Sequence, residues 1–128
     1  MAAVRMTTSA LPTAAAVFVA GNLLHTADHL RQGTGRLATE VFAGGTVISL
    51  GAFLVLYLAL RGDPRARVGG IVVGGFAAVG VAAAHLLPHW SAFSDSYPDI
   101  GADVLSYLIV LVEIATALYL AVTAYRTR

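Results

Sequence analysis

The chain has no cysteine and no lysine among its 128 residues. Without cysteine there can be no disulfide, no thiolate metal site, no c-type haem attachment and no thiol redox chemistry. Charged residues make up only 12% of the chain, whereas about a quarter is usual in soluble domains. The formal net charge is +1, and neither a basic run nor a glycine-rich phosphate-binding motif occurs, so nothing supports binding of nucleic acid or nucleotide. Any chemistry must come from His, Asp, Glu or Tyr.

Apolar residues fill the chain instead: 58% of it is hydrophobic, and the mean hydropathy is +0.78. A membrane helix needs about twenty mostly apolar residues to cross roughly 30 Å of hydrocarbon. Four segments qualify, at about residues 11–30, 37–60, 68–90 and 102–125. We therefore predict an all-α integral membrane protein with four transmembrane helices in one domain, residues 1–128. The first run follows Arg5, as in a signal peptide, but we expect it to remain as a span.

The predicted loops are short, so consecutive spans should run antiparallel in an up-down-up-down bundle. Basic residues of short loops are held on the cytoplasmic side of a membrane. Two arginines fall on one side of this topology, Arg31 and Arg36, and six on the other: Arg5, Arg61, Arg65, Arg67, Arg126 and Arg128. This bias predicts that both termini are cytoplasmic. The preference for arginine, alanine, valine, glycine and leucine is typical of a high-GC bacterial genome, which favours a bacterial plasma membrane.

Small residues recur at helical spacing within the spans. Gly70 and Gly74 are four residues apart, as are Gly80 and Ala84. Such steps let helix backbones approach closely in membranes. We expect these residues to pack helices within one bundle or between subunits, rather than to bind a ligand.

Two pairs of histidines use up all four histidines of the chain. His25 and His29 lie four residues apart in HTADH, and His85 and His89 lie four residues apart in HLLPH. Residues at this spacing share one face of a helix. The first and third spans run in the same direction in the predicted topology, so both pairs should lie near the outer ends of their helices.

Carboxylates accompany the histidines. Asp28 lies on the same face as His25 and His29, and Glu40 lies in the first turn of the second span, at a similar depth. On the fourth span a polar stripe comprises Asp103, Ser106, Tyr107, Val110 and Glu113. Ionisable groups cost about 2.5–3.5 kcal/mol each at the membrane centre, so they normally face the bundle interior. Asn22, one turn from His25, extends the polar face inward.

Imidazoles at this spacing, with carboxylates on neighbouring helices, predict a site for a divalent transition metal, zinc, iron or copper. The predicted ligands are His25, His29, His85 and His89, with Asp28 and Glu40 as further ligands or as acceptors that orient the imidazoles. Glu113 lies deeper and is either another ligand or a proton-carrying group. Two alternatives remain open. One is a metal-free hydrogen-bonded network, and the other is a b-type haem held by one histidine of each pair.

The segments HTADH and HLLPH resemble the histidine boxes of membrane fatty-acid desaturases and hydroxylases. The resemblance covers these two segments alone, and the additional HxxHH boxes of those families are absent from the sequence.

These features predict a small membrane metalloprotein with its site near the outer face. If it is an enzyme, Glu40 or Asp28 would act as general base in hydrolysis, with Glu113 as a proton carrier, or iron or copper would support oxidation of a lipid-like or quinone-like substrate. One alternative is a transporter of metal ions or protons that uses Glu113 and works as a homo-oligomer. The other is a non-enzymatic accessory subunit whose glycine faces dock it to a larger membrane complex. The lipid bilayer is the expected partner throughout.

Overall fold

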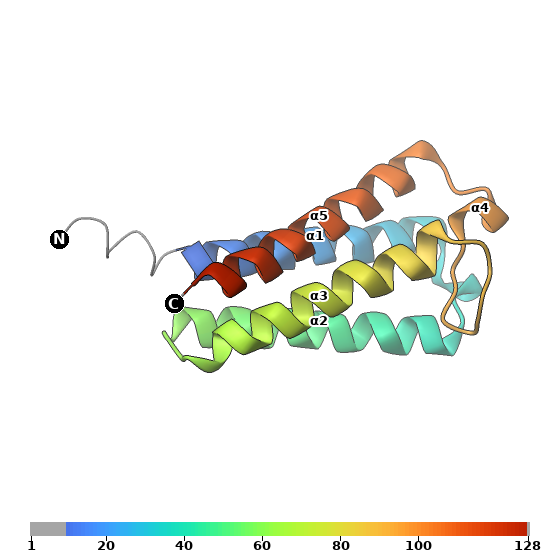
Figure 1. Cartoon of the computed structure of the whole chain (residues 1–128). Coiled ribbons are helices and arrows are strands. Elements are labelled where there is room, and N and C mark those ends of the chain that lie inside the picture. Colours follow the sequence, from blue (N-terminus) through green and yellow to red (C-terminus); the bar gives the residue numbers. More distant parts are fainter. Residues whose placement is uncertain (1–9, 128) are drawn as a thin grey trace.

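The computed structural model of the chain describes residues 10–127, and this part of the chain is helical with no strand. Four long helices lie side by side in Figure 1: α1 (Ala10–Gln32), α2 (Thr39–Leu60), α3 (Arg65–Leu86) and α5 (Val104–Arg126). Two short ones, η1 (Thr34–Arg36) and α4 (Tyr97–Ile100), lie in the connections. Each long helix is long and apolar enough to cross a membrane, which confirms the four predicted spans. Arg5 and Arg128, counted above in the arginine bias, lie outside the described residues.

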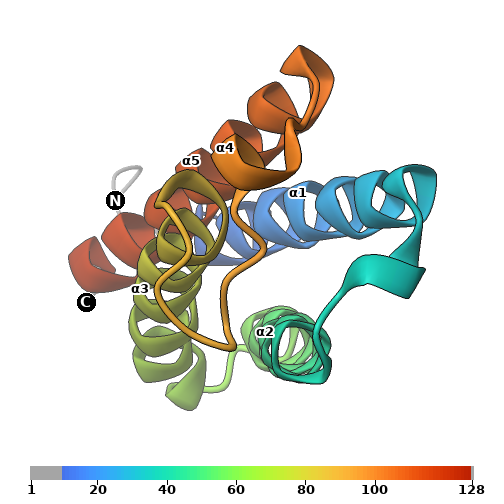
Figure 2. The same cartoon turned by 90° about the vertical axis from the view of Figure 1, so that its right-hand side faces the viewer.

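The four long helices form a bundle in which α2 is the most loosely held. The start of α1 and the end of α5 lie at one end of the bundle, here called the terminal end, and η1 and α4 lie at the other, the loop end (Figure 1). In Figure 2, which faces the loop end, α5 lies beside α1 and α3, while α2 lies on the opposite side of these two helices. Of the four long helices, α2 buries the smallest share of its residues.

One of the two predicted small-residue steps, Gly70 and Gly74, brings α3 close to α5, whereas a Cβ atom added at Gly80 would meet nothing within 4 Å. A Cβ atom added at Gly70 would lie 2.8 Å from Ala124 Cβ, and one added at Gly74 would lie 2.6 Å from the carbonyl oxygen of Ala117. Because any larger residue at Gly74 would collide with backbone, glycine is what permits this contact. The glycine step therefore packs helices within one chain.

Helix α3 ends at Leu86, before the predicted end of the third span near Trp90. Pro88 accounts for this, because a proline disfavours helical conformation in the residue before it and donates no backbone hydrogen bond. The following loop folds back on the helix end: the amide of Asp95 donates to the carbonyl of Ala84 at 3.0 Å, and Trp90 Nε1 donates to that of Ala83 at 2.8 Å. The loop thus satisfies helix-end carbonyls and brings Asp95 over α3.

The start of α5 is joined to the end of α1 by an arginine. Asp103 caps α5 by accepting from the amide of Ser106 at 2.9 Å. Arg31 Nη1 donates to Asp103 Oδ2 at 2.8 Å, and Arg31 Nε donates to Asp28 Oδ1 at 2.8 Å. Hydrogen bonds from Arg31 and from the Ser106 amide lower the pKa of Asp103 to about 2. The bundle is therefore closed at its loop end by charge-assisted hydrogen bonds.

Candidate metal centre

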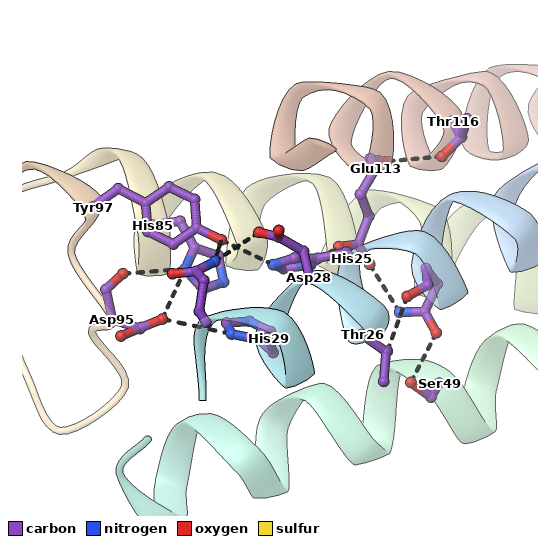
Figure 3. A network of polar contacts seen from close by, with 12 residues as sticks. His25, Thr26, Asp28, His29, Ser49, His85, Asp95, Tyr97, Glu113 and Thr116 are labelled. Carbon is purple, nitrogen blue, oxygen red and sulfur yellow. Dashed lines mark hydrogen bonds and ion pairs between the residues drawn. The ribbon is translucent and has the colours of Figure 1, made fainter. Parts of the chain in front are cut away.

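Three of the four histidines come together near the loop end of the bundle (Figure 3). His25 and His29 come from α1 and His85 from α3, and one nitrogen of each lies within 4.8 Å of the others. The ring centroids are 4.5 Å apart for His25 and His29, 4.8 Å for His25 and His85, and 5.2 Å for His29 and His85. His25 and His85 are buried and His29 is half-buried. This histidine cluster is compact enough to hold one metal ion.

Each ring of the histidine cluster turns its Nδ1 atom toward an oxygen. His25 Nδ1 contacts Glu113 Oε2 directly. His85 Nδ1 lies 3.1 Å from the backbone carbonyl of Asp95, which can only accept, so this nitrogen carries a proton. The carboxylate of Asp95 lies 3.8 Å from His29 Nδ1 and 3.6 Å from His85 Nδ1. With Nδ1 facing an oxygen in each ring, Nε2 is the nitrogen left to bind a metal, and at His25 it lies 3.4 Å from the hydroxyl of Tyr97.

The partner of His25 is itself held in place by a buried chain of hydrogen bonds. Glu113 of α5 is 1% exposed, and its Oε1 accepts from Asn22 Nδ2 at 2.8 Å. Asn22 Oδ1 in turn accepts from the hydroxyl of Ser49 on α2 at 2.8 Å. This series of contacts, from Ser49 through Asn22 and Glu113 to His25, therefore links α1, α2 and α5 to the cluster.

Tyr97 closes the cluster on the side of α4. Its side chain is fully buried, its hydroxyl lies 3.4 Å from His25 Nε2, and its ring centroid lies 4.7 Å from that of His85. Burial raises the pKa of Tyr97 well above its usual range. Burial likewise raises the pKa of Asp95, an effect that the positive charge of Arg36 opposes. Both residues come from the segment between α3 and α5, so this segment acts as a cap.

The other predicted ligands lie elsewhere. Asp28 is buried, but its carboxylate accepts from Arg31 Nε at 2.8 Å and Gln32 Nε2 at 2.6 Å. His89 is exposed in the loop after α3, where its backbone amide donates to Asp99 Oδ2 at 2.8 Å. It does not share a helical face with His85, because α3 ends between them. Glu40 is exposed on α2 and lines a cavity beside the cluster.

Three residues that contact the cluster or its hydrogen-bonded chain were not picked out in the sequence as site residues. These residues are Ser49, Asp95 and Tyr97. Asp95 and Tyr97 lie between helices, where no periodicity predicts a side chain's position. Of the stripe predicted on α5, Ser106, Val110 and Glu113 are buried, as expected of a face turned inward.

A cavity of about 700 Å³ adjoins the histidine cluster. It lies between α2 on one side and α1 and α3 on the other, and its lining is mostly apolar. The polar part of its wall includes Asn22, His25, His29, Ser49 and His85. A molecule in this cavity would therefore touch the cluster at one point and apolar side chains over most of its surface.

The chain matches no known protein-family model, and comparisons with curated proteins and with solved structures find no similar protein. The function is therefore argued from the histidine cluster, its oxygen partners and the adjoining cavity.

Proposed function

We propose that the protein is a small multi-pass membrane metalloprotein in which His25, His29 and His85 bind one divalent transition metal through Nε2. The observation that carries the proposal is the set of oxygen partners on Nδ1. Metal-binding histidines almost always donate their other ring N–H to a carboxylate or carbonyl, which sets the tautomer and the ring orientation. Glu113 and Asp95 are placed for this role. Imidazole ligands suit zinc, copper and iron, so ligand type leaves the metal open among these three.

Three protein ligands favour a catalytic centre over a structural one. Structural zinc sites are closed by four protein ligands, whereas catalytic sites keep a position for water or substrate. A bound metal would supply Lewis acidity and a lowered water pKa. The hydroxyl of Tyr97 lies 3.4 Å from His25 Nε2. Tyr97 is therefore the residue best placed to exchange a proton with water or substrate at the centre. Asp28 is engaged by Arg31, so Glu40 on the cavity wall remains the better of the two proposed bases.

We also propose that the helices run up and down through the membrane and place the cluster near its outer face. The turn after α2 lies at the terminal end in Figure 1, and so do Arg61, Arg65 and Arg126. At the loop end, Arg31 is paired with Asp28 and Asp103, which offsets its charge. The arginine bias therefore favours a cytoplasmic terminal end, and the plasma membrane of a bacterium fits this orientation.

The other functions considered from the sequence have weaker support. The chain of hydrogen bonds from Ser49 to His25 suits proton movement, but the described side chains buried between Glu113 and the terminal end are apolar and offer no onward path. Imidazoles in ring contact leave no room to clamp a haem between His25 and His85. Gly70 and Gly74 pack inside the bundle, so an accessory subunit would have to dock on the unobstructed Gly75 and Gly80 of α3.

Elemental analysis of the purified protein tests the metal. We expect about one metal ion per chain after supplementation with zinc, iron or copper, and loss of that ion in His29→Ala and His85→Ala. The control is His89→Ala, which alters an exposed histidine outside the cluster and should keep its metal. Circular dichroism confirms that each variant folds. Metal-free wild-type protein, or His85→Ala with undiminished metal, would overturn the proposal. Loss of metal in His89→Ala would instead favour the four-histidine site predicted from the sequence.

A further inference from the structure

The cavity beside the histidine cluster exists because the first half of α2 stands away from its neighbours. None of residues 39–47 is buried, and the buried positions of this helix begin at Ile48. In the second half of α2, by contrast, Ala52, Val55 and Ala59 are buried in the core. The helix is thus anchored at the terminal end and separated from α1 and α3 at the loop end. A volume of about 700 Å³ is within the range of roughly 300–1,000 Å³ that small-molecule sites occupy.

Exposed apolar side chains of α2 and α3 form part of the cavity wall. Leu50 and Phe53 of α2 and Phe76 and Val79 of α3 line it, and these side chains are 66%, 47%, 67% and 72% exposed. They lie in the middle parts of helices that are long enough to cross a membrane. In a bilayer, these apolar rims face hydrocarbon, so a molecule can enter from the lipid without passing through water.

The charges on the cavity wall select against an anionic head group. Glu40 and Glu113 line the cavity, and within residues 10–127 no arginine does. Apart from a metal ion held by the histidine cluster, a phosphate would meet no cation there to offset its lost hydration, which is costly. The polar groups on the wall are instead imidazoles, the amide of Asn22 and the hydroxyl of Ser49. Such groups match an uncharged oxygen-bearing head.

We propose that this cavity binds a neutral single-chain lipid, a long-chain molecule whose only polar group is a hydroxyl or carbonyl oxygen. The oxygen lies at the histidine cluster, and the chain lies along Phe53 and Phe76 toward the bilayer. The assignment of this lipid as the substrate rests on the proposed metal centre, whereas the binding itself rests on the cavity.

Glycines offer a way to fill the cavity without disturbing the bundle. Gly80 of α3 lines the cavity, and a Cβ atom added there would meet nothing within 4 Å. Gly75 of the same helix is equally unobstructed, but it does not line the cavity. The variant Gly80→Leu therefore places a side chain in the space for the lipid, and Gly75→Leu is its matched control.

Trp90, the single tryptophan of the chain, lines the cavity and reports on its contents. We would titrate the detergent-solubilised protein with brominated long-chain alcohols, in which bromine quenches tryptophan fluorescence at contact. We expect saturable quenching that unlabelled dodecanol displaces and that a brominated phospholipid does not reproduce. Gly80→Leu should raise the half-saturating alcohol fraction about tenfold or more, equivalent to about 1.4 kcal/mol, while Gly75→Leu should not change it.

The outcomes separate this inference from the proposed metal centre, because metal content is measured on the same samples. Bound metal with no saturable quenching, or with equal quenching in Gly80→Leu, would overturn the lipid site and leave the metal centre standing. Saturable quenching in metal-free protein would support the lipid site but would contradict the assignment of the lipid as substrate of a metal centre. Saturable quenching by the brominated phospholipid would overturn the neutral class of ligand. A dimer in solution that Gly80→Leu dissociates would identify a second copy as the occupant, against the proposal.

Discussion

The two halves of the bundle differ in what their helices bury. Toward the terminal end, here called the apolar half, the buried side chains include Phe18, Val55, Ala117, Leu120 and Ala124, all apolar. Toward the loop end, the histidine half, they include Asn22, His25, His85, Ser106 and Glu113. In lipid, helices gain little from hiding apolar surface from one another, so close packing and hydrogen bonds must hold them. Close packing holds the helices together in the apolar half, and hydrogen bonds hold them together in the histidine half.

This difference shows how a short chain can combine close helix packing with a polar site. The contact of α3 with α5 at Gly70 and Gly74 supplies close packing away from the site. The histidine half then has room for a cavity and for side chains that are costly to bury alone. If the two halves are separable in this way, a substitution that destabilises the apolar half should leave the metal affinity of the histidine half unchanged.

The largest effect on stability is expected in the apolar half, from Gly74→Ala. The added methyl group would lie 2.6 Å from the carbonyl oxygen of Ala117, so α3 and α5 must move apart. We expect a loss of about 1–3 kcal/mol in the free energy of unfolding, measured by SDS titration in mixed micelles. Gly75→Ala, where the methyl group meets nothing within 4 Å, is the control and should not destabilise the protein. Metal affinity per folded molecule should stay unchanged in both variants, and a parallel loss of metal in Gly74→Ala would show that the halves are coupled.

A second effect, on metal affinity, is expected in the histidine half from Glu113→Gln. This change replaces the carboxylate that contacts His25 Nδ1 with a neutral amide and removes its orienting charge. Loss of such a partner typically weakens metal binding about 10- to 100-fold. Competition with a chromophoric chelator measures the affinity. Glu40→Gln alters an exposed glutamate on the same cavity and should leave the affinity unchanged. Equal metal affinities in wild type and Glu113→Gln would show that Glu113 does not support the metal centre.

The smallest effect is expected at the far edge of the histidine half, from Asp103→Asn. This change weakens the link between Arg31 and α5, and both partners are accessible to solvent, so little stability is lost. Because the pKa of Asp103 is lowered to about 2, the ionised carboxylate stabilises the fold. That contribution is present above about pH 4 and is lost as the pH falls through about 2.

Thermal unfolding of wild type and Asp103→Asn, compared at about pH 6 and about pH 3, measures this contribution. The gap between the two melting temperatures should be larger at the higher pH and should narrow on acidification. Arg31 keeps its hydrogen bond to Asp28 in the variant, which limits the gap at either pH. A gap that widens toward low pH would contradict the lowered pKa of Asp103.

The sequence alone is enough to predict a helical protein with four segments able to cross a membrane, because run length and hydropathy are properties of each segment. It also determined that His25 and His29 share a face, because helical periodicity holds within one unbroken helix. Glu113 was singled out correctly as an inward-facing acid, since the stripe on α5 is periodic. These parts of the fold and site are local.

The three-dimensional packing of the chain settles which groups meet. It joined His85 to the first pair and left His89 outside, because Pro88 ends α3 before the second pair is complete. It brought Asp95 and Tyr97 over the histidines through an irregular loop, and it turned Asp28 toward Arg31. Contacts between distant segments depend on how helices pack and how loops fold back, and the spacing of residues along one helix does not say which helix or loop its face will meet.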